Sequence, residues 1–169
     1  MQEVLIEKIV VNMGIGADPE KMKRGEKVIQ EITGKKPVKT SGNKRIPDWG
    51  VRPGVALGLK VTLRDKAAKD FLELTFKAKE NVMKAKSFDK EGNFGFGIKE
   101  HIDLPGVKYD PKLGILGFDV LVTLKKRGYR VKMRRLHKEK VGRKQRVSKE
   151  NAIDFIKAMG VEVQWNNKK

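Results

Sequence analysis

The 169-residue sequence contains no cysteine, only two histidines and no apolar run long enough to cross a bilayer. The absence of cysteine excludes disulfide frameworks, thiolate nucleophiles and cysteine-based zinc sites. His101 and His137 are too few for a histidine-rich metal site, and we expect neither a metal nor a cofactor. A membrane span needs about 20 apolar residues, and residues 1–4 do not have the layout of a signal peptide. These absences predict a soluble, intracellular protein with no membrane partner.

Acidic residues are also scarce, because 39 lysines and arginines face 21 aspartates and glutamates, for a net charge of +18. Apolar residues make up 38% of the chain, which is enough to bury a core. We expect one compact domain, residues 1–169, built from an N-terminal segment (1–58) and a C-terminal segment (59–169). A positive excess of this size indicates a polyanionic partner, most often nucleic acid.

The positive charge is concentrated in one segment. Residues 125–149 hold thirteen lysines and arginines and one acid, Glu139. A lighter basic cluster runs through residues 35–52. Charge runs are often only solvated surface, but such surface usually mixes both signs. The one-sided charge of residues 125–149 therefore favours binding to a phosphate backbone.

Hydrophobic periodicity predicts alternating strands and helices. The expected strands cover residues 3–13, 35–39, 55–63, 94–99 and 117–124. Asp18 and Pro19 predict the start of a helix that ends at Gly34. Two more helices are expected, one capped by Asp65 and running to Ala78, the other beginning at Ser148 and stopping at Gly160, with Ala152, Ile153, Phe155, Ile156 and Met159 on its buried face.

This order predicts an α+β fold with an antiparallel or mixed sheet, helices on one face and the other face open to RNA. Residues 40–54, rich in glycine, proline and cations, are expected to form a long projecting basic loop with few internal contacts. The strand at 55–63 alternates strictly, which places Lys60, Thr62 and Arg64 on its wet face. Gly58 lies on the same face, two residues before Lys60, where it would let a partner approach closely.

Two glycine motifs favour structural roles. Gly14 and Gly16 lie between a strand and a helix, as in dinucleotide-binding folds, but the third glycine of that fingerprint is replaced by Pro19. A tight turn is sufficient to explain the motif. The pair Lys35–Lys36 after Gly34 lacks the Ser or Thr and the upstream spacing of a P-loop.

Two further motifs leave alternatives open. Glu100, His101 and Asp103 are residue types of a metal-dependent nuclease, although a surface turn before Pro105 also explains them. The stretch around Phe94 and Phe96 is similar to the aromatic signature of RNA-recognition domains, in which exposed rings stack on bases. The same alternation would suit one face of a core.

The strongest candidate site is distributed over several elements. It combines Asn12 at the end of the first strand, the pair Lys35 and Lys36, the wet face of the 55–63 strand and the basic loop. Asparagine and threonine read base edges and 2′-hydroxyls, and lysine and arginine bind phosphates.

These residues also carry a resemblance to a known family. EKIVVNMGIG at 7–16, TGKKPV at 33–38, KVTLR at 60–64 and GNFGFGIKEHI at 92–102 resemble the large-subunit ribosomal protein L5 family. The likeness runs in order from about Val4 to Val163. The basic segment with GRKQRVSKE at 142–150 is similar to the archaeal and eukaryotic branch.

The resemblance implies binding to 5S rRNA in the central protuberance through the open sheet face. Asn12, Thr62 and Arg64 fall on residues that read RNA in the family. Lys35 replaces a glutamine, and because lysine cannot accept a hydrogen bond, its contact must be donor-only. The expected 5S rRNA-binding residues are Asn12, Lys35, Lys36, Lys60, Thr62 and Arg64.

The resemblance also implies further contacts. The long loop, with Lys44, Arg45 and Arg52, is expected to reach the elbow of the P-site tRNA, and the distal edge to join a bridge to a small-subunit protein. Neighbouring large-subunit proteins and large-subunit rRNA are the other expected partners. The expected contacts to the rRNA backbone come from Arg127, Arg130, Arg134, Arg135, Arg143, Lys144 and Arg146.

The sequence thus indicates a non-catalytic component of the large subunit, cytoplasmic and located in the ribosome. Two alternatives from other classes stay open. One is a metal-dependent RNA-processing enzyme that uses Glu100, His101 and Asp103. The other is a free RNA chaperone, which would bind many RNAs with little preference.

Overall fold

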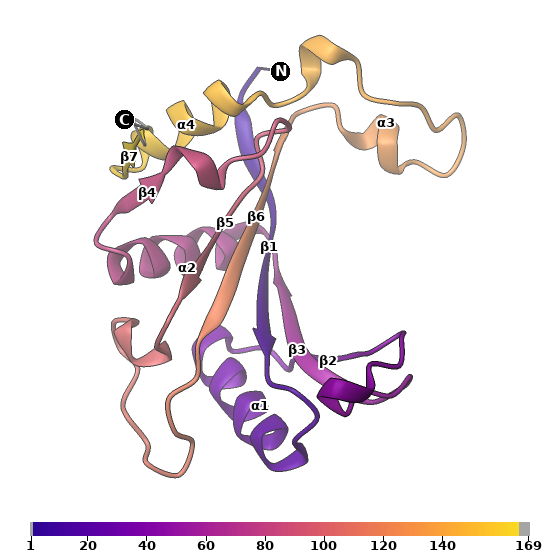
Figure 1. Ribbon diagram of the computed structural model, residues 1–169. Helices are drawn as coiled ribbons and strands as arrows, with labels where there is room; N and C mark the ends of the chain where they lie inside the picture. The colour runs from indigo at the N-terminus through magenta and orange to yellow at the C-terminus, as the bar shows by residue number, and fades with distance from the viewer. Residues whose placement is uncertain (1, 166–169) are drawn as a thin grey trace. The chain divides into compact units, whose positions relative to one another are not determined.

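The computed structural model describes residues 2–165 and has the α+β fold that the sequence predicts (Figure 1). Its elements are β1 (Val4–Gly14), α1 (Pro19–Thr33), β2 (Val38–Ser41), η1 (Pro47–Trp49), β3 (Ala56–Leu63), α2 (Asp65–Ala78), β4 (Val82–Lys84), η2 (Ala85–Ser87), β5 (Phe94–Ile98), η3 (His101–Asp103), β6 (Phe118–Lys126), α3 (Arg130–Met133), η4 (Arg143–Gln145), α4 (Lys149–Ala158) and β7 (Glu162–Gln164). A five-stranded sheet has the order β2-β3-β1-β6-β5, and β4 pairs with β7 in a parallel two-stranded sheet. Within residues 2–165, no helix has the length and apolar character of a membrane span.

The chain divides into two compact units, each made from several segments. The first unit contains the residues up to Ile9, Arg64–Phe96 and the residues from Leu121 onward. The second contains Val10–Leu63 and Gly97–Val120. The strands of the larger sheet contribute residues to both units, and each unit is described separately below.

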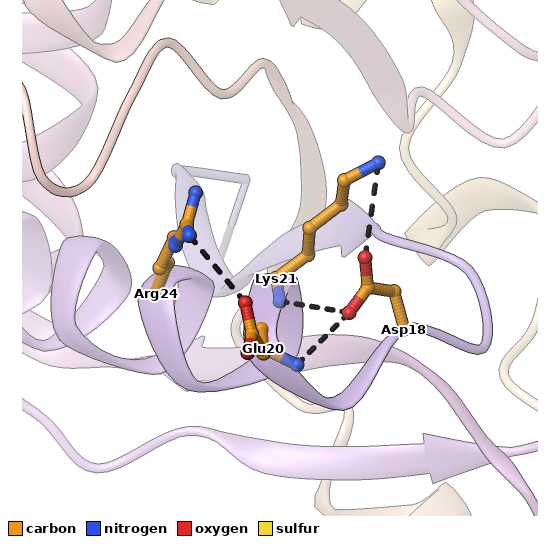
Figure 2. A network of polar contacts seen from close by, with 4 residues as sticks. All are labelled: Asp18, Glu20, Lys21 and Arg24. Atoms are coloured by element: carbon orange, nitrogen blue, oxygen red, sulfur yellow. Dashed lines mark hydrogen bonds and ion pairs between the residues drawn. The ribbon is translucent and has the colours of Figure 1, made fainter.

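In the second unit, α1 begins and ends through local chemistry, as its sequence predicts. The carboxylate of Asp18 accepts hydrogen bonds from the backbone N–H groups of Glu20 (2.9 Å) and Lys21 (3.3 Å), which Figure 2 shows. The Arg24 guanidinium lies 3.6 Å from the Glu20 carboxylate, an exposed pair worth well under 1 kcal/mol. Gly34 ends the helix at φ 65°, a conformation that glycine adopts without strain.

Helix α1 packs closely on the sheet because it carries a glycine at the contact. A Cβ at Gly25 would lie 2.5 Å from the Ile15 side chain and 3.2 Å from the side chains of Met13 and Leu59. Met13 in β1 and Leu59 in β3 are both fully buried. The helix therefore covers the sheet face that carries these side chains, and the alternate residues of β1 and β3 point the other way.

Strand β3 has the predicted alternation, with Leu59, Val61 and Leu63 buried and Lys60 and Thr62 exposed. Its partner β2 starts at Val38 instead of Lys35, so the strand predicted for residues 35–39 is displaced toward the C-terminus. The pairing is antiparallel, with Val38 opposite Lys60 and Thr40 opposite Gly58.

Gly58 corrects one sequence prediction. The residue is buried, and a Cβ there would lie 2.7 Å from the backbone carbonyl oxygen of Met13. The glycine is needed because β1 of the same chain approaches closely. It does not make room for an external partner.

The segment between β2 and β3, which we call the basic finger (residues 42–55), has more internal contacts than its composition predicts. Ile46 and Val51 exchange two backbone hydrogen bonds of 3.0 Å, and Gly42 bonds with Val55 and Gly54. The 3-10 turn η1 closes the tip, and the Val51 side chain is buried. The expectation of an exposed segment holds for most of its residues, but that of few internal contacts is wrong.

In the first unit, aromatic residues from α2 and β5 form part of the core. The ring centroids of Phe76 and Phe96 are 5.6 Å apart, those of Phe76 and Phe94 6.4 Å, and those of Phe88 and Phe94 5.3 Å. All four rings are buried. This packing corrects the hypothesis that Phe94 and Phe96 stack on bases.

Other elements of the first unit follow the sequence with small differences. Asp65 opens α2 at φ 55°, but it is not the cap, because Arg64 occupies that position without a capping hydrogen bond from its side chain. Ser148 caps α4 as predicted by accepting from the Asn151 backbone N–H. On α4, Phe155 and Met159 are half-buried and not fully buried as expected.

Candidate nucleic-acid interface

The open face of the second unit carries polar side chains without internal partners. Lys60 and Thr62 are exposed on β3, and Asn12 is half-buried on neighbouring β1. In the described part of the chain, none of these three side chains makes a hydrogen bond or an ion pair within the protein. Their donors and acceptors are therefore available to an external ligand, as the sequence predicts for a wet face.

Cations adjoin this face at two places along the chain. Lys35 and Lys36 are exposed directly after the C-cap of α1. The hydroxyl of Thr33 donates to the Ile29 carbonyl at 2.6 Å and accepts from the Lys35 backbone N–H at 3.3 Å, which orders the chain at this point. Arg64, the residue after β3, is also exposed. All six residues predicted for 5S rRNA binding are thus at least partly accessible.

One cation of the lighter basic cluster pairs with an acid of the same unit. The Lys39 ammonium on β2 lies 2.9 Å from the Glu26 carboxylate on α1. Lys39 pairs with buried Leu59 in the strand register, so it lies on the helix-covered side of the sheet. The ion pair links β2 to α1 and leaves the Lys39 side chain about half exposed.

The basic finger exposes Lys44, Arg45 and Arg52, as predicted. It also exposes Trp49, whose side chain is 75% accessible at the end of η1. A large aromatic ring among cations suits stacking on nucleic acid. The sequence analysis missed Trp49, although a tryptophan followed by glycine in a basic loop is a signal that could have found it.

In the first unit, residues 125–149, which we call the basic arm, run from the end of β6 to the first residue of α4 and contain α3 and η4 (Figure 1). The Gln145 side chain donates to the Arg127 carbonyl at 2.6 Å, and the Tyr129 hydroxyl accepts from the Val147 backbone N–H at 3.3 Å. These contacts join the beginning of the arm to its end. Lys126 is buried and bonds to Gln2, so this cation is not presented to a partner.

All seven arm residues predicted to contact the rRNA backbone are exposed: Arg127, Arg130, Arg134, Arg135, Arg143, Lys144 and Arg146. Three of them are held by internal contacts. Arg134 and Arg146 donate through Nε to the carbonyls of His137 (2.6 Å) and Val141 (3.1 Å), which orients their guanidinium groups. Arg127 pairs with Glu3 at 2.9 Å, but both side chains are more than half exposed, and such pairs are weak enough to exchange for a phosphate.

The Glu100–Asp103 motif does not form a metal site in the structure. His101 is only 2% exposed, which corrects the expectation of a surface turn. Its Nδ1 accepts from the Leu116 backbone N–H at 3.4 Å, and its own backbone N–H donates to the Leu116 carbonyl at 3.0 Å. Over residues 2–165, no group of three or more His, Asp or Glu side chains has an arrangement that could hold a metal ion.

The glycine motif after β1 has the structural role that the sequence favours. The backbone N–H groups of Ile15 and Gly16 both donate to the Leu57 carbonyl, at 3.0 and 2.9 Å. Gly16 has φ 89°, which explains its glycine. The motif is a tight turn that returns the chain from β1 toward α1.

Comparison with known proteins matches nearly the whole chain. Residues 1–52 match the family model described as ribosomal protein L5, and residues 56–155 match the ribosomal L5P family C-terminus. A protein named large ribosomal subunit protein uL5 from Pyrobaculum aerophilum is 49% identical over 164 residues, covering 96% of this chain and 92% of its own. Proteins of the same name from Methanococcus vannielii and Sulfolobus acidocaldarius are 47% and 45% identical, over 96% and 93% of this chain and 92% and 88% of their own.

Proposed function

Since the chain belongs to the ribosomal protein L5 family, we propose that it binds 5S rRNA through the open sheet face of its second unit. It is an RNA-binding protein of the large ribosomal subunit, and its place is in the ribosome. Its task there is binding and positioning, and it carries out no reaction of its own.

The observation that carries this proposal is the set of unpartnered polar groups on β1 and β3. Asn12 supplies both donors and an acceptor, and Thr62 supplies a hydroxyl that can donate and accept. Lys60, next to Thr62 on the same strand face, brings a positive charge within reach of a phosphate. A face with these groups can set the register of a folded RNA while the cations supply most of the affinity.

We further propose different partners for the two basic segments. The basic arm would lie along rRNA backbone, because its ten exposed cations face a single acid, Glu139. The basic finger would contact the P-site tRNA through Lys44, Arg45 and Arg52. The distal edge would contribute to a bridge with a small-subunit protein, and neighbouring large-subunit proteins would complete its surroundings.

Co-purification tests the 5S assignment. The tagged full-length chain is expressed in an archaeal host and recovered at moderate salt, and the bound RNA is sequenced. We expect 5S rRNA to be strongly enriched over tRNA and over unrelated structured RNA of similar length. A mixture of RNAs without enrichment would indicate a general RNA chaperone and contradict the proposal. Cleavage of the RNA that is lost in His101→Ala would instead indicate an enzyme.

A further inference from the structure

The first unit contains a hollow of about 560 Å³ beneath the basic arm, and the binding of rRNA backbone does not account for it. Its walls come from the arm, from β1 and β6, and from the turn before β5. A volume of this size lies within the range of small-molecule binding sites. We infer that this arm hollow binds one unstacked RNA nucleotide with an amino-bearing base, and that guanine fits it best. The inference rests on the proposed function, because it assumes that the arm meets RNA.

Hydrogen bonds within the arm fix the shape of the hollow. The two ends of the arm are tied by the contact from Gln145 to the Arg127 carbonyl and by the contact from Val147 to the Tyr129 hydroxyl. Across the arm, the Glu139 backbone N–H donates to the Val131 carbonyl at 3.3 Å. Tyr129 and Glu139 both line the hollow, so its shape follows from bonded groups.

The arm side of the hollow suits a phosphate. The arm contributes four cations to its lining, Lys132, Lys138, Lys140 and Arg146, against one acid, Glu139. The Nε of Arg146 is held by the Val141 carbonyl, which leaves the terminal N–H groups of the guanidinium to bind an anion. Charge-assisted hydrogen bonds of this kind are the strongest that a protein offers to a phosphate.

The walls of the hollow that come from β1 and from the turn before β5 suit a base that donates hydrogen bonds. Glu7 and Glu91 line it, and within residues 2–165 neither carboxylate lies within 4.0 Å of a lysine or arginine nitrogen. Asn93 also lines it, and its side-chain N–H group donates to Asp89 at 3.0 Å, which leaves the amide oxygen as an acceptor. Ionised carboxylates only accept hydrogen bonds, so these groups require a ligand with N–H donors.

This pairing of charges identifies the ligand. Cations from the arm and acceptors from β1 and the turn before β5 line the same hollow, and together they complement a nucleotide, which joins an anionic phosphate to a base. Guanine presents two adjacent N–H donors that a carboxylate can accept together, whereas uracil presents carbonyl oxygens on both sides of its single N–H. A base inside a helix cannot enter, because its donors are paired. The nucleotide must be unstacked, which is how RNA is usually read by sequence.

The first test compares fluorescent five-residue RNAs, UUGUU and UUUUU, binding to the full-length protein. We expect UUGUU to bind at least about fivefold more tightly, the discrimination of one good bidentate contact. The affinity of UUIUU, whose inosine lacks the amino group, should lie between those of UUGUU and UUUUU. Glu91→Gln and Glu7→Gln should bring the ratio toward one, and Glu162→Gln on β7, which removes the same charge away from the hollow, should keep it. Because Glu91 is exposed, its variant remains informative if Glu7→Gln lowers stability.

A second test locates the contact and its source. UUGUU with 6-thioguanosine is crosslinked to the protein with near-ultraviolet light, and we expect adducts in peptides that contain Asn93, Tyr129 or Lys140. Competition with 5S rRNA and with large-subunit rRNA fragments then identifies which RNA supplies the nucleotide. Equal affinity for all probes, or adducts only in the basic finger, would overturn the inference while 5S binding persists. Failure of 5S binding itself would instead overturn the proposed function.

Discussion

The side chain of Gln145 donates a 2.6 Å hydrogen bond to the backbone carbonyl of Arg127, eighteen residues earlier in the chain. This bond joins the start of the basic arm to its end. A segment with thirteen cations repels itself, and such segments are commonly disordered. Here the neutral side chain of Gln145 supplies a hydrogen bond that holds the backbone of this cationic segment in one conformation. The arm therefore presents its arginines in a defined arrangement.

We therefore predict that Gln145→Ala loosens the arm more than the rest of the protein. One net hydrogen bond contributes about 0.5–1.5 kcal/mol. Amide hydrogen exchange in residues 127–147 should become faster, with little change in α2. Gln164→Ala, which replaces an exposed residue of β7, is the control and should leave the arm unchanged. Arm exchange rates equal to those of the wild type would contradict this account of the arm.

Gly58→Ala should destabilise the second unit. The added Cβ would meet the Met13 carbonyl oxygen at 2.7 Å, and backbone of a paired strand cannot move away easily. We expect a loss of about 1–3 kcal/mol in the free energy of unfolding, the usual cost of overpacking. Urea unfolding measures it. Gly14→Ala is the matched control, since no atom lies within 4 Å of its added Cβ, and it should change stability by less than about 0.5 kcal/mol.

Local sequence patterns predict some elements of this fold and miss others. The ends of α1 were predictable because Asp18 and Gly34 act on backbone groups within four residues. The alternation of β3 was predictable because one face of this strand is buried and the other is exposed to solvent. The parallel pair β4–β7 was not predicted, because each strand has three residues and the partners are about 80 positions apart.

Burial was harder to predict where a pattern fits two environments. Phe94 and Phe96 alternate whether they face a core or an RNA, and only contact with Phe76 distinguishes the two. His101 is buried and bonds to the backbone of Leu116, fifteen positions away, which no local pattern indicates. At the candidate interface, the exposure of Lys60 and Thr62 followed from strand parity. Trp49 and the arm hollow did not, because they depend on how loops fold.

The basic finger and the basic arm should have separable roles. Replacement of Lys44, Arg45 and Arg52 with alanine should leave 5S rRNA affinity nearly unchanged and increase the rate at which P-site tRNA leaves assembled ribosomes. Neutralising five of the six arm arginines should instead lower incorporation into the large subunit and reduce the salt slope of rRNA binding by about one per lost phosphate contact. The replaced residues are Arg130, Arg134, Arg135, Arg143 and Arg146.

Both variants are compared in the same two assays, 5S rRNA affinity and the off-rate of ribosome-bound tRNA. Residues of the finger are internally hydrogen-bonded through the backbone, so alanine replacements of its exposed cations should not disturb its fold. If the finger variant loses 5S affinity as severely as a variant of the sheet face, the two segments do not have separate roles.

The most direct measurement is the affinity of 5S rRNA for the wild type and for the Asn12→Ala/Thr62→Ala double variant across a range of KCl concentrations. We predict a steep wild-type slope, about −0.7 to −0.9 per phosphate neutralised. The double variant should bind about 5- to 150-fold more weakly, from two hydrogen bonds of about 0.5–1.5 kcal/mol each. Its slope should match the wild type, because neither residue is charged.

Thr75→Ala is the matched control for this measurement, since the Thr75 hydroxyl is buried and donates to the Leu72 carbonyl at 2.9 Å. That variant should have a lower melting temperature and an unchanged affinity for 5S rRNA. The double variant should keep the wild-type melting temperature and bind 5S rRNA more weakly. A flat salt response of the wild type, or full 5S affinity in the double variant, would contradict the assignment of the open sheet face as the RNA-binding surface.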